Sequence, residues 1–201
     1  VLKELPDVIE DIRHCFLSPD QQSLYQQTID QDGQKLLKAF NDSENPFPHL
    51  SFLALVQQLK QICNHPCQLT KSTSYNYYSS GKWELFKEIL NECLEADLKI
   101  VVFSQYTAML DIIEQYLEDM KIPHTGLRGS CSLPKRQLQV ESFNNDPKIR
   151  VFCASLLAGG TGIDLTGAQA VIHYDRWWNS AKEEQATARV HRFGQQQAVQ
   201  V

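Results

Sequence analysis

The sequence predicts an α/β fold: a mainly parallel sheet flanked by helices, with a helical insertion ahead of it. From residue 81 onward, short β-branched runs alternate with segments of helical period, which is the pattern of a parallel sheet covered on both faces. Residues 1–70 are instead mostly helical in pattern after a short extended start. Polar residues or glycines follow three expected strands, where open α/β sheets carry their ligand sites.

Composition narrows the class of protein. The chain has 201 residues, of which 42% are apolar and 21% charged, as in a globular protein with a buried core. Its six cysteines lack the spacing of a disulfide framework, so we expect a reducing, intracellular compartment. No apolar run approaches the roughly 20 residues needed to span a bilayer, so we expect no membrane association. The net charge of −5 argues against strong nucleic-acid binding by this chain alone. The opening residues, without Met or a signal peptide, look like the middle of a longer protein.

The first predicted domain covers residues 1–80. Ser18, Pro19 and Gln21 form a helix entry, with Ser18 as the N-cap, Pro19 at the first position and Gln21 completing a capping box. A second helix is expected over residues 50–63, and residues 71–80 form a polar linker.

The second predicted domain, residues 81–201, contains the sheet. A reduced, buried cysteine fits the apolar segments around Cys93 and Cys153. Thr107 is the expected cap of the helix that follows the strand expected at residues 98–103. Strands are expected at residues 98–103, 149–154 and 170–174, with a short extended piece near residues 123–126 and another at the C-terminus. Helices are expected at residues 83–96, 107–120, 133–143 and 180–193.

The glycine-rich segment after the strand at residues 149–154 is a candidate ligand loop. Gly159, Gly160 and Gly162 allow the backbone to approach a ligand closely, and Thr161 and Asp164 offer polar groups to a phosphate or a water. The segment fits neither the dinucleotide fingerprint nor a Walker A loop. A flexible surface turn is the alternative interpretation. After another strand, Ser104 and Gln105 precede a helix N-terminus and suit a phosphate or a plain cap equally well.

The last predicted helix carries a candidate anion site. Residues 180–183 read as a capping box, and Gln185, Arg189 and Arg192 then follow at helical spacing, so all three are expected on one face. Arginine presents a planar fork that suits phosphate oxygens. In the alternative interpretation this is a solvated face, with the arginines paired to Glu183 and Glu184.

Two further features are interpreted as structural. The segment Cys63-Asn64-His65-Pro66-Cys67 lacks a second Cys/His pair at zinc-site spacing, so no metal site is expected. Trp177 and Trp178 are expected to pack rather than to stack on bases.

With these residues in view, the chain resembles the second RecA-like lobe of the Swi/Snf-related, helicase-like ATPases of superfamily two, which translocate on double-stranded DNA. The resemblance runs nearly end to end, and Asp175-Arg176-Trp177-Trp178-Asn179 resembles bacterial members most closely. The matching segments are Leu17 to Tyr25, Ile62 to Pro66, Ser80-Gly81-Lys82, Val101 to Gln105, the glycine loop, and Gln185 to Gln195.

The resemblance implies roles for individual residues. Arg192 and Arg189 would be arginine fingers that reach the γ-phosphate of ATP, which with Mg²⁺ would be held mainly by an absent first RecA-like lobe of the same protein. The nucleotide cleft, coupled to the DNA track, would involve Gln185, Gly160, Gly162 and Asp164. Contacts to the phosphates of double-stranded DNA would come from Ser104, Gln105, Gly129, Ser130 and Thr161.

Three positions depart from the family pattern. Asp164 stands where Asn is usual, Ala188 where Asp is common, and Ser180 where Pro is common. The added carboxylate of Asp164 either weakens phosphate approach or binds a water, which leaves the coupling role of the glycine loop open. Two other functions also stay open: a non-catalytic nucleic-acid or protein binding module, and a strand-separating helicase of the same superfamily.

Overall fold

The computed structural model describes residues 5–41, 46, 48–70, 74–129, 131–155 and 162–201. Contacts divide the chain into two compact units. One is His14–Leu85, and the other combines Val1–Arg13 with Phe86–Val201. The units part inside helix α5 (Gly81–Glu95), close to the change of pattern near residue 80. Within the described ranges, no helix combines the length and the apolar character that crossing a membrane requires.

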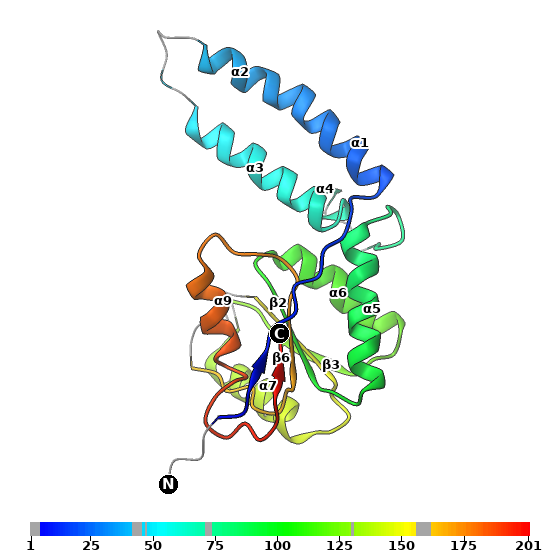
Figure 1. The fold of residues 1–201 in the computed structure, drawn as a ribbon, viewed down its shortest axis with the longest axis vertical. Helices are drawn as coiled ribbons and strands as arrows, with labels where there is room; N and C mark the ends of the chain where they lie inside the picture. Colours follow the sequence, from blue (N-terminus) through cyan, green and yellow to red (C-terminus); the bar gives the residue numbers. More distant parts are fainter. Residues whose placement is uncertain (1–4, 42–45, 47, 71–73, 130, 156–161) are drawn as a thin grey trace. The chain divides into compact units, whose positions relative to one another are not determined.

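The unit His14–Leu85 is helical (Figure 1). Helix α1 (Pro19–Thr28) continues through a π-helical turn, η1 (Ile29–Gly33), into α2 (Gln34–Phe40). Helix α3 (His49–Asn64) packs against α1 and is followed by the short α4 (Cys67–Thr70). The predicted entry is confirmed, because the Ser18 hydroxyl accepts from Gln21 N while the Gln21 side chain accepts from Ser18 N.

Gln21 also joins three segments of this unit. Its buried side chain donates from Nε2 to the carbonyls of Ile62, at 2.7 Å, and Cys63, at 3.0 Å, near the end of α3. Its Oε1 accepts from the N–H of Gly81, at 3.0 Å, where α5 begins. Every hydrogen-bonding group of a buried amide is thus used, which fixes the two helix ends relative to α1.

His65 organises the segment that follows α3. The ring is fully buried, and its Nδ1 accepts from the N–H of Cys67 while Nε2 donates to the carbonyl of Tyr75, each at 3.2 Å. The indole of Trp83 meets the ring edge-on, with centroids 5.7 Å apart. Burial lowers the pKa of His65 to about 4, against a smaller opposing effect of the Tyr75 carbonyl. His65 is therefore a neutral packing residue.

The other unit contains a six-stranded sheet, in which every pair of neighbouring strands is parallel. Its order is β1-β6-β5-β2-β4-β3, so both ends of the chain supply an outer part of it (Figure 1). The predicted α/β fold with a parallel sheet and a helical insertion is confirmed. The strands are β1 (Val8–Ile9), β2 (Ile100–Ser104), β3 (His124–Leu127), β4 (Val151–Ser155), β5 (Ala170–His173) and β6 (Val199–Gln200).

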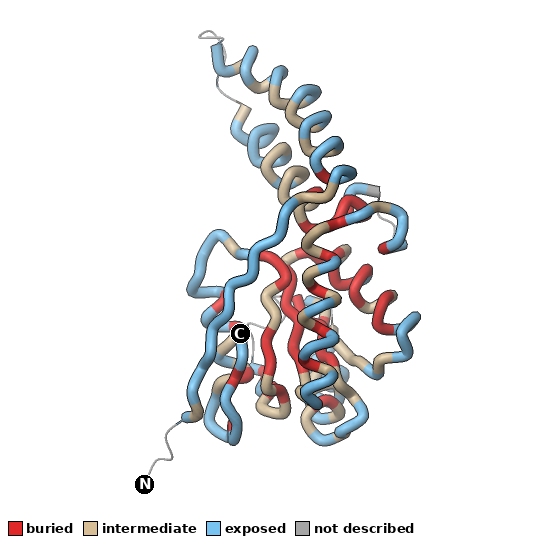
Figure 2. The backbone as a smooth tube through the Cα atoms, turned by 45° about the vertical axis from the view of Figure 1, so that its right-hand side comes forward, coloured by how far each residue is buried: buried red, intermediate tan, exposed pale blue. Residues whose placement is uncertain are grey.

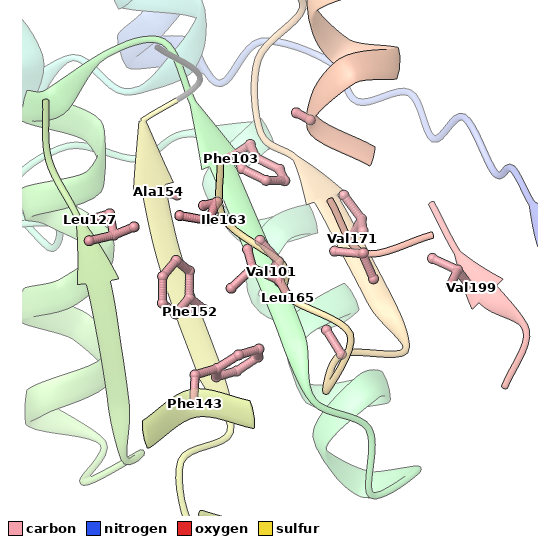
Figure 3. Packing of buried hydrophobic residues seen from close by; sticks show 13 residues of the cluster. Val101, Phe103, Leu127, Phe143, Phe152, Ala154, Ile163, Leu165, Val171 and Val199 are labelled. Atoms are coloured by element: carbon pink, nitrogen blue, oxygen red, sulfur yellow. The ribbon is translucent and has the colours of Figure 1, made fainter. Parts of the chain in front are cut away.

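Helices cover both faces of the sheet. All five residues of β2 are buried, which requires cover on each side. Helices α7 (Leu133–Asn145) and α9 (Ser180–Thr187) contribute Phe143 and Ala186 to a core cluster with Val101 and Phe103 of β2 (Figure 3). Helix α6 (Thr107–Asp119) contacts β2 and β4 but contributes nothing to that cluster, so it covers the other face. Figure 2 shows burial concentrated in these strands and in α6.

Several predicted bounds differ from the observed ones by one or two residues; β4, for example, begins at Val151 rather than at residue 149. Strand β2 begins at Ile100 rather than at residue 98, because α5 ends in a turn in which Asp97 has a φ of 59° and the N–H of Leu98 reaches back to the Cys93 carbonyl. The cap of α6 is Tyr106, and Thr107 is already helical. All six cysteines are free thiols.

Candidate functional site

The three segments that the sequence singled out leave neighbouring strands at the same edge of the sheet. Strand β2 lies between β5 and β4, and all three run parallel, so their carboxyl ends meet. Of the predicted site residues, Gly160, Thr161 and Ser130 lie outside the described residues. Gly129, after β3, is exposed, and a side chain added there would meet open space.

The end of β2 is held by Asp175, which follows β5. Asp175 is buried, and its carboxylate accepts from the Ser104 hydroxyl and, at 3.0 Å, from the N–H of Gln105. The Gln105 amide donates in turn to the Arg176 carbonyl, at 3.1 Å. The Ser104 hydroxyl, which also accepts from the N–H of Tyr106, is enclosed in this network rather than presented to solvent. Gln105 is the half-exposed member of the pair.

The second half of the glycine loop is braced from several sides. Gly162 has a φ of 62°, which glycine adopts without strain. The Asn144 side chain donates to the Asp164 carbonyl, at 2.8 Å, and accepts from the N–H of Gly167, at 3.0 Å. The N–H of Leu165 donates to the Arg189 carbonyl, at 2.8 Å. The side chains of Ile163 and Leu165 enter the core cluster, so the backbone at Asp164 is anchored on both sides (Figure 3).

Helix α9 begins at Ser180, as predicted, but its N-cap and its C-terminal end differ from the prediction. Its N-cap is Asn179, whose side chain accepts from the N–H of Ala181, so the capping box expected at Ser180 is wrong. Glu183 instead turns inward and accepts from the N–H of Trp177, at 2.6 Å, while pairing with Arg176, at 2.9 Å. The sequence did not distinguish two adjacent polar residues that can both cap a helix.

The last helical residue is Thr187, six residues before the predicted end at 193. In a continuing helix the Arg189 carbonyl would accept from the residue four positions on, but it accepts from Leu165 instead. The expected single face of Gln185, Arg189 and Arg192 is therefore wrong. Gln185 lies exposed on α9, whereas both arginines follow its end in a series of turns.

Arg192 faces the glycine loop across this connection. Its Nη1 lies 2.5 Å from Oδ1 of Asp164, and the two side chains are 47% and 57% exposed. The alternative pairing of the arginines with Glu183 or Glu184 is not the one found for Arg192, since Glu183 pairs with Arg176. Arg189 is half-buried beside the same loop. A guanidinium thus meets a carboxylate at the edge where the sheet places its loops.

The side-chain amide of Gln195 stabilises this arrangement through hydrogen bonds. Its amide is 8% exposed, and Nε2 donates to the carbonyl of Ala168, at 2.7 Å, with longer contacts to the carbonyls of Thr166 and Val190. Its Oε1 accepts from the N–H groups of Gln196 and Gln197, at 2.9 and 3.1 Å. One buried amide therefore ties the arginine segment to the end of the glycine loop.

His173 is a site neighbour that the sequence analysis did not single out. Its ring stacks on Phe103, with centroids 5.6 Å apart, and Nε2 lies 2.9 Å from the Thr187 hydroxyl at the end of α9. Burial lowers the pKa of His173, with an opposing effect of Glu183. The sequence signal that could have identified it is a histidine near the carboxyl end of the strand expected at residues 170–174. Among the described residues, no three potential metal ligands lie together.

Comparisons with known proteins agree with this architecture. Residues 81–194 match the model of the helicase conserved C-terminal domain. A protein of Mycoplasma genitalium described as an uncharacterized ATP-dependent helicase is 39% identical over 203 residues, which cover 100% of this chain and 19% of that protein. Transcription regulatory protein SNF2 of Saccharomyces cerevisiae is 32% identical over 222 residues, which cover 100% of this chain and 12% of that protein.

A solved structure agrees as well. The SWI2/SNF2 ATPase core of Sulfolobus solfataricus in complex with double-stranded DNA matches with a TM-score of 0.79 and 32% identity, covering 98% of this chain and 40% of that chain. This chain thus spans about a fifth or less of the two curated relatives, at 19% and 12% of their lengths.

Proposed function

This chain belongs to the helicase conserved C-terminal domain family, as a C-terminal lobe of the Swi/Snf-related branch of superfamily two, and from this premise we propose that it completes the ATP site of a double-stranded-DNA translocase. A first lobe of the same protein would hold most of the nucleotide and its Mg²⁺. This chain would contribute donors to the γ-phosphate and part of the DNA track.

The position of Arg192 is the observation that carries the proposal. Its guanidinium is partly exposed at the carboxyl edge of the sheet, next to the glycine loop, and it already engages an anionic group there. An arginine finger stabilises the charge that develops on the equatorial phosphate oxygens, an effect of roughly 10³- to 10⁵-fold in rate. Arg189, which is half-buried, would be the second and less accessible finger.

The remaining nucleotide contacts would be made around this guanidinium. Gln185, exposed on α9, would line the cleft. Gly162, with its positive φ, and Gly160 would let the loop backbone approach the nucleotide closely. Asp164, the residue of this loop that pairs with Arg192, would link the nucleotide site to the DNA track.

The DNA track would run past the other loops of the same edge. Gln105 and Gly129 are accessible and suit contacts to backbone phosphates, and Ser130 and Thr161 are proposed for the same role. The enclosed hydroxyl of Ser104 would act indirectly, since it shares Asp175 with the N–H of Gln105. Contacts of this kind are independent of base sequence and weaken as salt rises.

The test is the steady-state ATPase of the full-length protein, measured with and without duplex DNA, for wild type and Arg192→Ala. We expect stimulation by duplex that falls with salt. We also expect the variant to lose about a thousandfold or more in turnover, the low end of the range for an arginine finger. Arg13→Ala is the matched control, because that guanidinium is engaged by Asp11 and Glu92.

Three outcomes would redirect the proposal. Unchanged turnover in Arg192→Ala would remove the finger assignment. An absence of hydrolysis under every nucleic-acid condition would favour a non-catalytic binding module. Displacement of one strand from a forked duplex at the rate of ATP turnover would favour a strand-separating helicase.

A further inference from the structure

We propose that Asp164 is a positioning residue for Arg192: its carboxylate holds the guanidinium while the nucleotide cleft is empty, and the terminal phosphate of ATP competes with it for that guanidinium. This inference rests on the proposed function, because it takes Arg192 to be a group that contacts ATP. It assigns to the acidic side chain of the glycine loop a role in tuning nucleotide affinity.

The contact itself selects Asp164 among the nearby acids. Arg192 Nη1 and Asp164 Oδ1 are 2.5 Å apart, across 28 residues of sequence. Glu183 is nearly buried and is occupied by Arg176 and by the N–H of Trp177. Glu184 is exposed on α9. Asp164 is thus the acid that meets Arg192.

The two partners differ in how firmly they are held. The backbone of Asp164 is fixed by Asn144 on one side and by the bond from Leu165 to the Arg189 carbonyl on the other. Arg192 instead carries a long side chain from a turn and is 47% exposed. The carboxylate therefore acts as a fixed acceptor, and the guanidinium is the partner that can move between acceptors.

The strength of the pair fits an exchangeable contact. Ion pairs between exposed side chains are weak, because water and salt screen the charges and because the side chains lose conformational freedom. Both partners here are about half exposed, at 47% and 57%. A phosphate carries more charge than a carboxylate and offers several oxygens to the planar fork of arginine, so it can displace Asp164. The competition should lower ATP affinity by roughly two- to fivefold.

The test is the equilibrium affinity of the full-length protein for a non-hydrolysable ATP analogue, in a double-mutant cycle of Asp164→Asn and Arg192→Ala. Asparagine keeps the size of the side chain and removes its charge. We expect Asp164→Asn to tighten binding about two- to fivefold in the wild-type background and to leave it unchanged in the Arg192→Ala background. In the ATPase assay the same change should lower KM by that factor.

Glu184→Gln is the control, since it removes one carboxylate from the exposed surface of α9. It should leave analogue binding unaltered. Equal tightening by Asp164→Asn in both backgrounds would mean that Asp164 repels the phosphate directly, and this would overturn the inference. Unchanged or weaker binding in the wild-type background would overturn it as well. The proposed function is tested separately, by the turnover of Arg192→Ala and by the dependence of ATP hydrolysis on duplex DNA.

Discussion

Single buried polar residues hold the segments of this chain together. Gln21 bonds the ends of α3 and α5 to α1, and Gln195 bonds the arginine segment to the end of the glycine loop. Both amides are inside the protein, where an unmade hydrogen bond costs about 1–3 kcal/mol. Each lies in a segment that resembles the family. The hydrogen bonds give these two positions a structural role beside any functional one.

At the same scale, His65 should make folding pH-dependent. Its pKa is about 4 in the folded chain and about 6.5 when exposed, so the unfolded chain binds the proton first. The contribution of the neutral His65 ring to the free energy of unfolding is present above about pH 6.5 and is lost as the pH falls from 6.5 toward 4. Linkage gives a loss of about 2 kcal/mol between pH 7 and pH 5.

Urea unfolding at the two pH values measures this loss. His65→Gln should remove most of the difference between pH 7 and pH 5, whatever it does to stability at pH 7. His14→Gln, at an exposed ring, should keep the wild-type difference. The assignment is wrong if the two variants show the same pH dependence.

At the scale of elements, helix ends depend on contacts with distant residues. Helix α9 ends at Thr187, and after it the Arg189 carbonyl accepts from the N–H of Leu165 rather than from a further helical turn. Helix α7 ends over Lys99, whose ammonium donates to the carbonyls of Phe143 and Asp146 and lies 4.7 Å from the centroid of the Phe143 ring. A cation there satisfies carbonyls that have no helical partner and complements the helix dipole.

Lys99→Met should therefore destabilise the fold by about 1–2 kcal/mol, because methionine retains the packing against Phe143 and loses the charge. Lys148→Met removes the same charge at an exposed position and should change stability by less than about 0.5 kcal/mol. Unfolding in urea, followed by circular dichroism, compares the two. Equal stability of both variants would show that the ammonium does not support α7.

At the scale of the whole molecule, the chain gathers its polar loops on one edge of the sheet and presents a guanidinium there. If ATP is held mainly by another lobe, Arg192 has no phosphate to reach in the isolated chain. We therefore expect negligible ATP hydrolysis by residues 1–201 alone, with or without duplex DNA. Sustained turnover by this chain, at the rate of the full-length protein under the same conditions, would contradict the split site.

The sequence by itself determined the α/β class, the position of most strands and helices, the entry of α1 and the family. These follow from local periodicity, turn residues and contiguous motifs, which act over a few residues. Tertiary structure alone decided what the segment after α9 bonds to, which acid meets Arg192 and why Ser104 is enclosed. Each of these depends on partners more than 20 residues away: Leu165 for Arg189, Asp164 for Arg192, and Asp175 for Ser104. A hydrogen bond to a distant group competes on equal terms with a local one, and only the packed fold settles which is made.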